Sequence, residues 1–172
     1  MVSFLIVLRL VHILAATFWV GAALMLTFYI SPTVGATQAS GQDFMRHFMG
    51  KTTFNLMMWA SALLAVIAGS LLYWMDSNGF KSAWMGTGPG IGYSVSATFA
   101  FLGLITGIFQ NRNSNAMAAL GGQIQGQGKP PSPEQAAQLQ GLGKALATGG
   151  TFNAIFLILA TIGMAIARYL VF

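Results

Sequence analysis

Residues 10–31 have the sequence LVHILAATFWVGAALMLTFYIS, and this stretch decides the fold of the chain. It holds no Asp, Glu, Lys or Arg over about 22 residues, which at ~1.5 Å per helical residue cover a ~30 Å hydrocarbon layer. One ionisable side chain interrupts it, His12, and Arg9 precedes that histidine by about one helical turn. An ionisable residue inside a membrane helix is costly and usually has a function. His12 is therefore the first candidate site residue.

The composition of the chain indicates that lipid is its main solvent. Of 172 residues, 55% are hydrophobic and 6% are charged, and the mean hydropathy is +0.68, whereas a soluble globular protein carries ~25% charged residues. The chain has no cysteine, which excludes disulfides, thiolate metal sites, iron–sulfur clusters and cysteine nucleophiles. The net charge of +5 comes from scattered basic residues, a pattern typical of membrane topology and not of a nucleic-acid-binding surface.

Four uncharged runs are long enough to span a membrane, at residues 10–30, 52–75, about 91–110 and 145–167, and the spans are expected at about residues 4–30, 52–75, 91–110 and 145–170. They are continuously apolar and do not alternate, so they predict helices, which satisfy their own backbone in lipid. The first run is too long for the apolar core of a signal peptide, and we expect it to be retained. The sequence thus predicts an all-α, polytopic membrane protein, a four-transmembrane-helix bundle forming a single domain over residues 1–172.

The basic residues predict how the helices are oriented. Five of them fall in the first and third connections: Arg46, Lys51, Arg112, Lys129 and Lys144. The other three fall on the opposite side of the membrane: Arg9, Lys81 and Arg168. Cytoplasmic connections carry the excess of Lys and Arg. We therefore expect a multi-pass protein of a bacterial-type inner (plasma) membrane, with both termini outside.

The third connection is predicted to be a helical hairpin. Ser132, Pro133 and Gln135 form the pattern of a capped helix start, so helices 3 and 4 are expected to extend into the cytoplasm over about residues 111–144. The glycine-rich residues 121–131 are expected to form its flexible turn.

Three further local features are expected from the sequence. The first connection, residues 32–51, is expected to be a loop. Gly149 and Gly150 are expected to kink or break the last helix where it enters the membrane. Residues 78–92 are expected to lie along the outer surface, where the neighbouring tyrosines and tryptophans favour the headgroup layer.

The two histidines of the chain, His12 and His47, cannot share one haem iron in a monomer. Helix 1 from His12 to its inner end covers ~27 Å, and His47 follows on that far side. Met164 lies near the outer end of the last span, at the depth expected for His12. Haem iron accepts His/Met ligation, so we predict a haem site with His12 as axial ligand, Met164 as the possible second ligand and Arg9 beside the cofactor.

Copper is the alternative cofactor, with His12 again the metal ligand. Cu(I) favours imidazole and thioether ligands, and Met164 and Met75 could supply the sulfur at the outer end. Residues 45–49, MRHFM, form a second and looser Met-x-His-x-Met run on the inner side.

Packing roles stand beside these functional ones. His12 can be a packed histidine bonded to a backbone carbonyl or a hydroxyl. Arg9 can extend to the interface, or contact a haem propionate, a quinone oxygen or Asp76. Asn55 and Asn153 are expected to be hydrogen-bond partners between helices.

A series of short motifs resembles the copper resistance CopD-like membrane proteins, a superfamily that includes the HemJ-type protoporphyrinogen oxidases. The motifs are RLVH at residues 9–12, WVG at 19–21, Pro32, GSLLYW at 69–74 and MAIARY at 164–169. The resemblance implies a four-helix bundle and, for the HemJ branch, haem b held by a helix 1 histidine, which corresponds to His12. No lysine within the expected spans matches the one of the HemJ type, so no particular enzymatic reaction is implied.

Three functional hypotheses follow. The first is a haem-binding or redox-associated membrane protein that acts in electron transfer or as a subunit of a larger redox complex. The second is a non-catalytic structural subunit of a membrane complex, and the third is copper handling. The expected partners are the lipid bilayer and other membrane subunits or further copies of the chain, and not nucleic acid.

Overall fold

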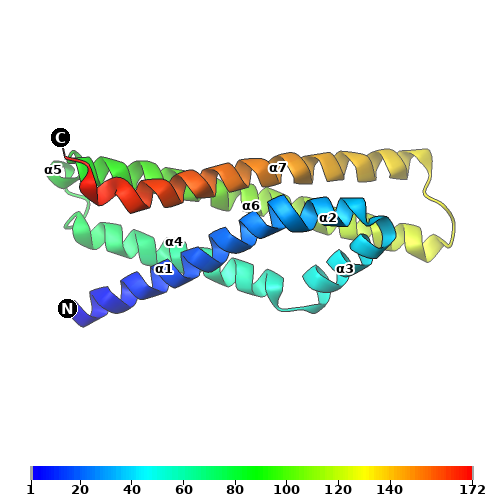
Figure 1. Cartoon of the computed structure of the whole chain (residues 1–172), viewed down its shortest axis with the longest axis horizontal. Coiled ribbons are helices and arrows are strands. Elements are labelled where there is room, and N and C mark those ends of the chain that lie inside the picture. The colour runs from blue at the N-terminus through cyan, green and yellow to red at the C-terminus, as the bar shows by residue number, and fades with distance from the viewer. Residues whose placement is uncertain (1, 172) are drawn as a thin grey trace.

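Every regular element is a helix within residues 2–171, the part of the chain that the computed structural model describes (Figure 1). The prediction of an all-α protein is therefore confirmed. The elements in chain order are α1 (Val2–Met25), the π-helix η1 (Leu26–Ile30), α2 (Ser31–Ala36), α3 (Gln38–Lys51), α4 (Phe54–Asp76), α5 (Ser82–Met85), α6 (Gly88–Gln127), α7 (Pro133–Ile166) and the 3₁₀ helix η2 (Ala167–Tyr169).

Four helical segments are long and apolar enough to cross a membrane, as the sequence predicts. They are Val2–Ala36, Phe54–Asp76, Gly88–Gln127 and Pro133–Tyr169. Three of them are much longer than the ~20 residues that a crossing requires. The extra length lies at one end of the molecule, where α2, the C-terminal part of α6 and the N-terminal part of α7 extend beyond α4 (Figure 1).

The expectation of a loop over residues 32–51 is wrong, because the first helix continues through Pro32 into α2 and α3 follows directly. A proline ring inside an α-helix collides with the carbonyl four residues before it. Here the preceding turn widens into η1, in which the Ser31 N–H bonds to the Leu26 carbonyl, five residues back. The wider π-turn gives the ring of Pro32 its room, so the helix passes the proline instead of ending there.

The flexible turn expected over residues 121–131 is shorter than predicted. Helix α6 continues to Gln127 and is closed by Gly128, whose φ of 60° is the left-handed conformation that glycine adopts without strain. The predicted start of the next helix is confirmed. The Ser132 hydroxyl accepts the Gln135 N–H, and the Gln135 side chain accepts the Ser132 N–H, which completes a capping box.

The break expected at Gly149 and Gly150 is also wrong, because α7 runs through both without interruption. The glycines serve instead as points of close approach. A Cβ at Gly150 would lie 3.3 Å from the Thr27 hydroxyl oxygen, and the Thr27 hydroxyl donates to the Gly150 carbonyl at 3.4 Å. Small residues let membrane-type helices pack backbone to backbone, and this pair joins α7 to η1.

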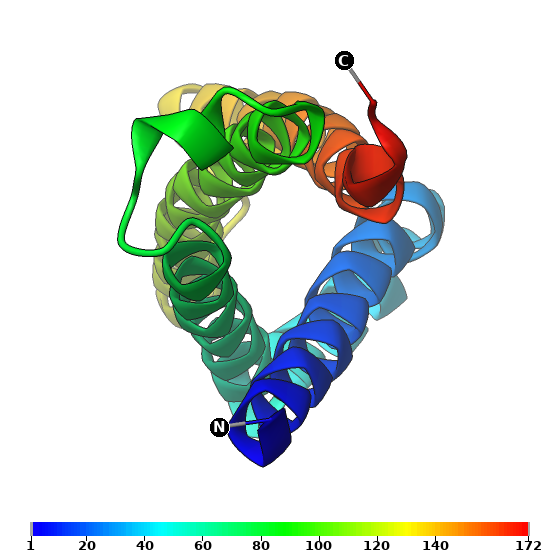
Figure 2. The same cartoon turned by 90° about the vertical axis from the view of Figure 1, so that its left-hand side faces the viewer.

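The long helices form two antiparallel pairs. Helix α6 packs against α7 along its length, and α1 packs against α4, while the two pairs touch each other at fewer points (Figure 2). The buried core lies where the pairs meet, and its members are mostly small: Ala15, Trp19, Ala23, Ala62, Ala65 and Leu157. A core with so many alanines requires close helix approach, because little side-chain volume separates the backbones.

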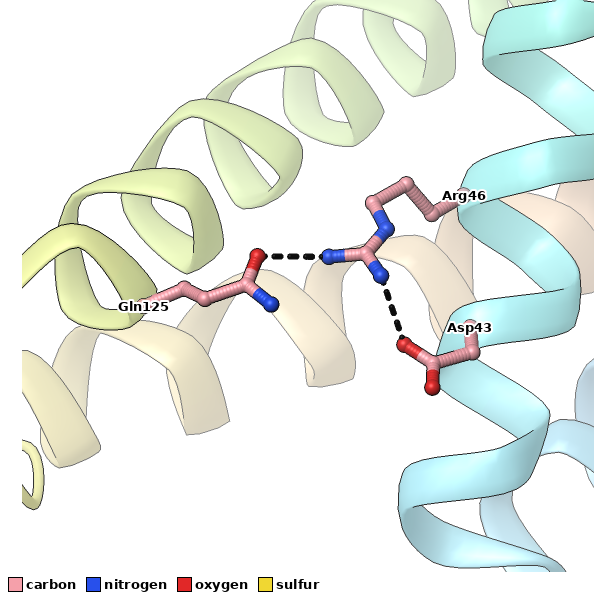
Figure 3. A network of polar contacts seen from close by, with 3 residues as sticks. All are labelled: Asp43, Arg46 and Gln125. Atoms are coloured by element: carbon pink, nitrogen blue, oxygen red, sulfur yellow. Dashed lines mark hydrogen bonds and ion pairs between the residues drawn. The ribbon is translucent and has the colours of Figure 1, made fainter. Parts of the chain in front are cut away.

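One polar contact ties the short α3 to the extended hairpin. The Arg46 guanidinium donates to the Gln125 side-chain oxygen of α6 at 2.7 Å and to the Asp43 carboxylate at 2.8 Å (Figure 3). Both Arg46 and Asp43 are exposed, so the ion pair itself contributes little to stability. The hydrogen bond from Arg46 to Gln125 connects α3 to α6.

Candidate functional site

His12 is fixed between α1 and α4 by one hydrogen bond. Its Nδ1 lies 2.8 Å from the backbone carbonyl oxygen of Ala65. A carbonyl only accepts, so Nδ1 must carry the proton. His12 stands on the buried stripe of α1, one turn from Ala15, and its side chain is half-buried.

Gly69 makes that contact possible. The Ala65 carbonyl already accepts the helical N–H of residue 69, and a side chain at position 69 would cover it. A Cβ added at Gly69 would lie 2.8 Å from Cε1 of His12 and 3.0 Å from Nδ1. The imidazole therefore lies directly on the bare backbone of α4.

The other ring nitrogen of His12 is not used within the protein. In the neutral tautomer that has its proton on Nδ1, the free lone pair is on Nε2. It forms no hydrogen bond with any residue of the described range, and no buried side-chain nitrogen or oxygen there lacks a partner, so Nε2 is accessible. Metal-ligating histidines usually donate the other N–H to a carbonyl in this way.

Met164 lies at the same depth as His12 on the opposite helix pair. The side chains of Trp19 in α1 and Leu157 in α7 both lie beside Gly103 of α6. Trp19 and Leu157 are therefore at about the same position along the long axis of the molecule. From that position, His12 and Met164 each lie about two helical turns toward the end of the molecule that holds both termini (Figure 1). Met164 also continues the buried stripe of α7, between Ala160 and Ala167.

No contact joins the two expected ligands within the described residues. His12 contacts α4, and Figure 2 shows the N-terminal end of α1 lying apart from the C-terminal end of α7. Two grooves of the described chain lie elsewhere. One is lined by Trp74, Met75, Asn78 and Gly79, and the other lies on the outward face of α6 and α7. A preformed pocket lined by both His12 and Met164 is therefore not among them.

Arg9 has the acidic partner that was one of its expected contacts. Its guanidinium lies 3.9 Å from the carboxylate of Asp76, the last residue of α4. The Arg9 side chain is 61% exposed, so the pair is loose and screened. It still places a positive charge about one helical turn before His12.

The Met-x-His-x-Met run of residues 45–49 does not bring its three side chains together. The run lies in helix α3 and not in a loop. Successive residues of a helix are ~100° apart, so residues two positions apart point to nearly opposite sides. Met45 and His47 therefore diverge. Helix α3 lies far along the molecule from the N-terminal half of α1 (Figure 1), which keeps His47 away from His12.

Asn153 is the interhelical hydrogen-bond partner that the sequence predicts. It is 3% exposed, and its amide donates to the Gly103 carbonyl at 2.6 Å and to the Thr106 hydroxyl at 2.9 Å. Asn55 is half-buried and takes no part in the side-chain hydrogen bonds between helices of the described chain. One of the two asparagines thus has the expected role.

One cluster of aromatic residues lies where α4, α5 and α6 meet. Tyr73 meets Trp84 edge to face at 5.4 Å between ring centroids, and Trp84 stacks with Tyr93 at 6.5 Å. The Tyr73 hydroxyl and the Ser94 hydroxyl share a hydrogen bond of 2.7 Å. This cluster fixes the connection between α4 and α6 at the level expected for an interface.

Sequence reasoning missed Ala65 and Gly69 as the residues that hold His12. Ala65 contributes only its backbone carbonyl, and a sequence pattern does not reveal which backbone group accepts a side-chain hydrogen bond. Gly69 could have been noticed, because it is the sole glycine of α4. A lone glycine inside an otherwise apolar helix indicates a close neighbour.

Comparisons with known proteins identify no relative: no family model, no curated protein and no solved structure matches this chain.

Proposed function

We propose that the chain spans a membrane four times, with both termini on one side. The main support is a band of exposed large apolar side chains, which begins and ends at matching heights on three helices. The band runs from Leu56 to Trp74 on α4, from Ile91 to Phe109 on α6 and from Phe152 to Tyr169 across α7 and η2. At ~1.5 Å per residue each stretch covers ~26 Å, close to the ~30 Å of a hydrocarbon core.

The charges support an orientation for this insertion. The α2–α3 segment and the extended α6–α7 hairpin carry five of the eight basic residues, and the positive-inside rule places them in the cytoplasm. The N- and C-termini, with Arg9 and Arg168, then face outward, as expected for a bacterial-type inner membrane protein.

Within this frame, we propose a haem-binding membrane protein with His12 as axial ligand. The observation that carries the proposal is the hydrogen bond from Nδ1 to the Ala65 carbonyl, which leaves Nε2 free and accessible. Met164 is the proposed second ligand, and the loosely paired Arg9 the cation for a propionate. The donor set fits haem b, which when bound supplies one-electron redox chemistry. The proposed relationship to the CopD-like and HemJ-like membrane proteins points to the same histidine.

An absorption spectrum of the purified protein tests this proposal. The protein is expressed in haem-sufficient cells, extracted in mild detergent and examined for a Soret band and for pyridine haemochrome. We expect His12→Ala to abolish the band and Met164→Leu to shift the reduced spectrum and lower the potential, since thioether ligation raises it. The matched control is His47→Ala, which removes the other histidine. A colourless wild type, or a band that His12→Ala leaves unchanged, contradicts haem binding at His12.

A second candidate function is a non-catalytic subunit of a membrane complex. It is favoured by the fit of the imidazole against Gly69, which gives His12 a complete packing role between α1 and α4. This function predicts a colourless protein that co-purifies with larger membrane proteins. Copper handling through His12, Met164 and Met75 is checked on the same sample, by metal analysis after purification under reducing conditions.

A further inference from the structure

Three basic residues follow the inner edge of the exposed apolar band. The band ends at Leu56 on α4, at Phe109 on α6 and at Phe152 on α7, and between residues 110 and 151 no large hydrophobic side chain is exposed. The first basic residue beyond this edge is Lys51 before α4, Arg112 on α6 and Lys144 on α7. All three are exposed.

The packing of α6 on α7 fixes the depth of two of them. Gln110 lies against Gly150, where a Cβ would be 3.5 Å from the Gln110 side-chain oxygen. Measured along the helices from this contact, Arg112 lies ~3 Å inward and Lys144 ~9 Å inward. The headgroup layer is ~5–7 Å thick on each side of the hydrocarbon, and long basic side chains reach several ångströms along the helix to meet it.

These cations are also free of acidic partners. Neither Lys51, Arg112 nor Lys144 forms an ion pair with a residue in the described range. The acidic residues of this half are engaged elsewhere. Asp43 pairs with Arg46, and Glu134 accepts the Ser132 hydroxyl at the far turn of the hairpin.

We propose that Lys51, Arg112 and Lys144 form a binding surface for the phosphate groups of anionic phospholipids. The proposal rests on the membrane insertion proposed above. It adds that anionic phospholipids of the inner leaflet bind to the protein at these residues. Charge complementarity and the edge of the apolar band favour this partner, because acyl chains on the band place a headgroup at these cations. Each Lys or Arg near an anionic surface contributes an attraction that corresponds to an affinity change of about fivefold.

Lipid binding is measured with the full chain in detergent. Phosphatidylglycerol is titrated in, and bound lipid is counted by native mass spectrometry, with phosphatidylcholine and inorganic phosphate as separate arms. The test variant is the triple substitution Lys51→Gln, Arg112→Gln and Lys144→Gln. We expect it to lose phosphatidylglycerol affinity by at least tenfold.

The control removes a charge from beyond the headgroup layer. It is Lys129→Gln, at the far turn of the hairpin, and we expect its phosphatidylglycerol affinity to stay within threefold of the wild type. Equal affinity in the triple variant and in Lys129→Gln, equal binding of phosphatidylcholine, or competition by inorganic phosphate alone overturns the proposal.

Membrane insertion is tested independently of the lipid surface. Alkaline extraction of membranes containing the wild type shows whether the chain is integral, and an extracted chain refutes insertion itself. Retention of the chain together with unchanged lipid binding in the test triple refutes only the cationic surface. Should the triple variant not fold, the three single variants are compared with Lys129→Gln in the same titration, and loss in none of them refutes the surface.

Discussion

Substituting Gly69 by alanine directly tests whether His12 packs on the bare backbone of α4 and bonds to the Ala65 carbonyl. The new Cβ would lie 2.8 Å from Cε1 of His12, and ordinary contact begins near 3.4 Å, so the ring must retreat by about 0.6 Å. A retreat of that size along the hydrogen bond lengthens the 2.8 Å contact with the Ala65 carbonyl to about 3.4 Å, beyond the usual N–H···O range of ~2.7–3.2 Å.

Two costs add to give the expected magnitude. An interhelical hydrogen bond in a membrane protein contributes ~0.6 kcal/mol on average and up to ~1.7 kcal/mol. Overpacking a tight contact costs ~1–3 kcal/mol. We therefore expect Gly69→Ala to lower the free energy of unfolding by about 2 kcal/mol. Gly21→Ala is the matched control, because Gly21 is exposed on α1 and a Cβ added there would meet no neighbouring group within 4 Å.

The assay is unfolding of the purified protein in mixed micelles by a denaturing detergent, followed by helical circular dichroism and by tryptophan fluorescence. A double-mutant cycle with His12→Ala isolates the contact. Once the imidazole is gone, Gly69→Ala meets no ring and should cost close to nothing relative to Gly21→Ala. An equal cost of Gly69→Ala with and without the imidazole refutes this account of the site.

Three further perturbations follow from the same packing. Asn153→Leu removes two hydrogen bonds to α6 and should cost about 1 kcal/mol in the same unfolding assay; an unchanged midpoint would show that the amide is not holding the helices. Gly163→Ala forces a methyl group against the Ser96 hydroxyl and should destabilise the α6–α7 pair by ~1–3 kcal/mol, with partial rescue by Ser96→Gly; no rescue contradicts this contact. The hydrogen bond from Ser132, followed by a backbone bond, lowers the pKa of the Glu134 carboxyl, so its contribution is present above the unfolded-state pKa and is lost as pH falls through the folded-state value. Thermal unfolding followed between neutral and acidic pH should show this loss in the wild type and not in Glu134→Gln, and identical profiles would contradict it.

The four long helices could be predicted from the sequence because each contains an apolar run of about 20 residues that holds no Asp, Glu, Lys or Arg. Their ends could not. Residues 32–51 contain Pro32 and several polar residues, which locally favour a loop, yet a widened turn at η1 carries the helix past the proline. Residues 121–127 contain three glycines and remain helical, because local propensity is a weak constraint on a helix with a packed neighbour.

The candidate site, too, could be predicted only in part from the sequence. The depth of His12 and Met164 follows from helical rise and the span limits, and the structure places both at matching levels on inward stripes. The partner of His12 does not follow from spacing, because it is a backbone carbonyl whose availability depends on Gly69 and on the rotation of α1 against α4. A carbonyl that accepts the imidazole N–H both packs the helix and sets the tautomer. The contact that explains His12 as a packing residue is therefore also the contact that leaves Nε2 free for a ligand, and only the spectrum of the purified protein separates the two roles.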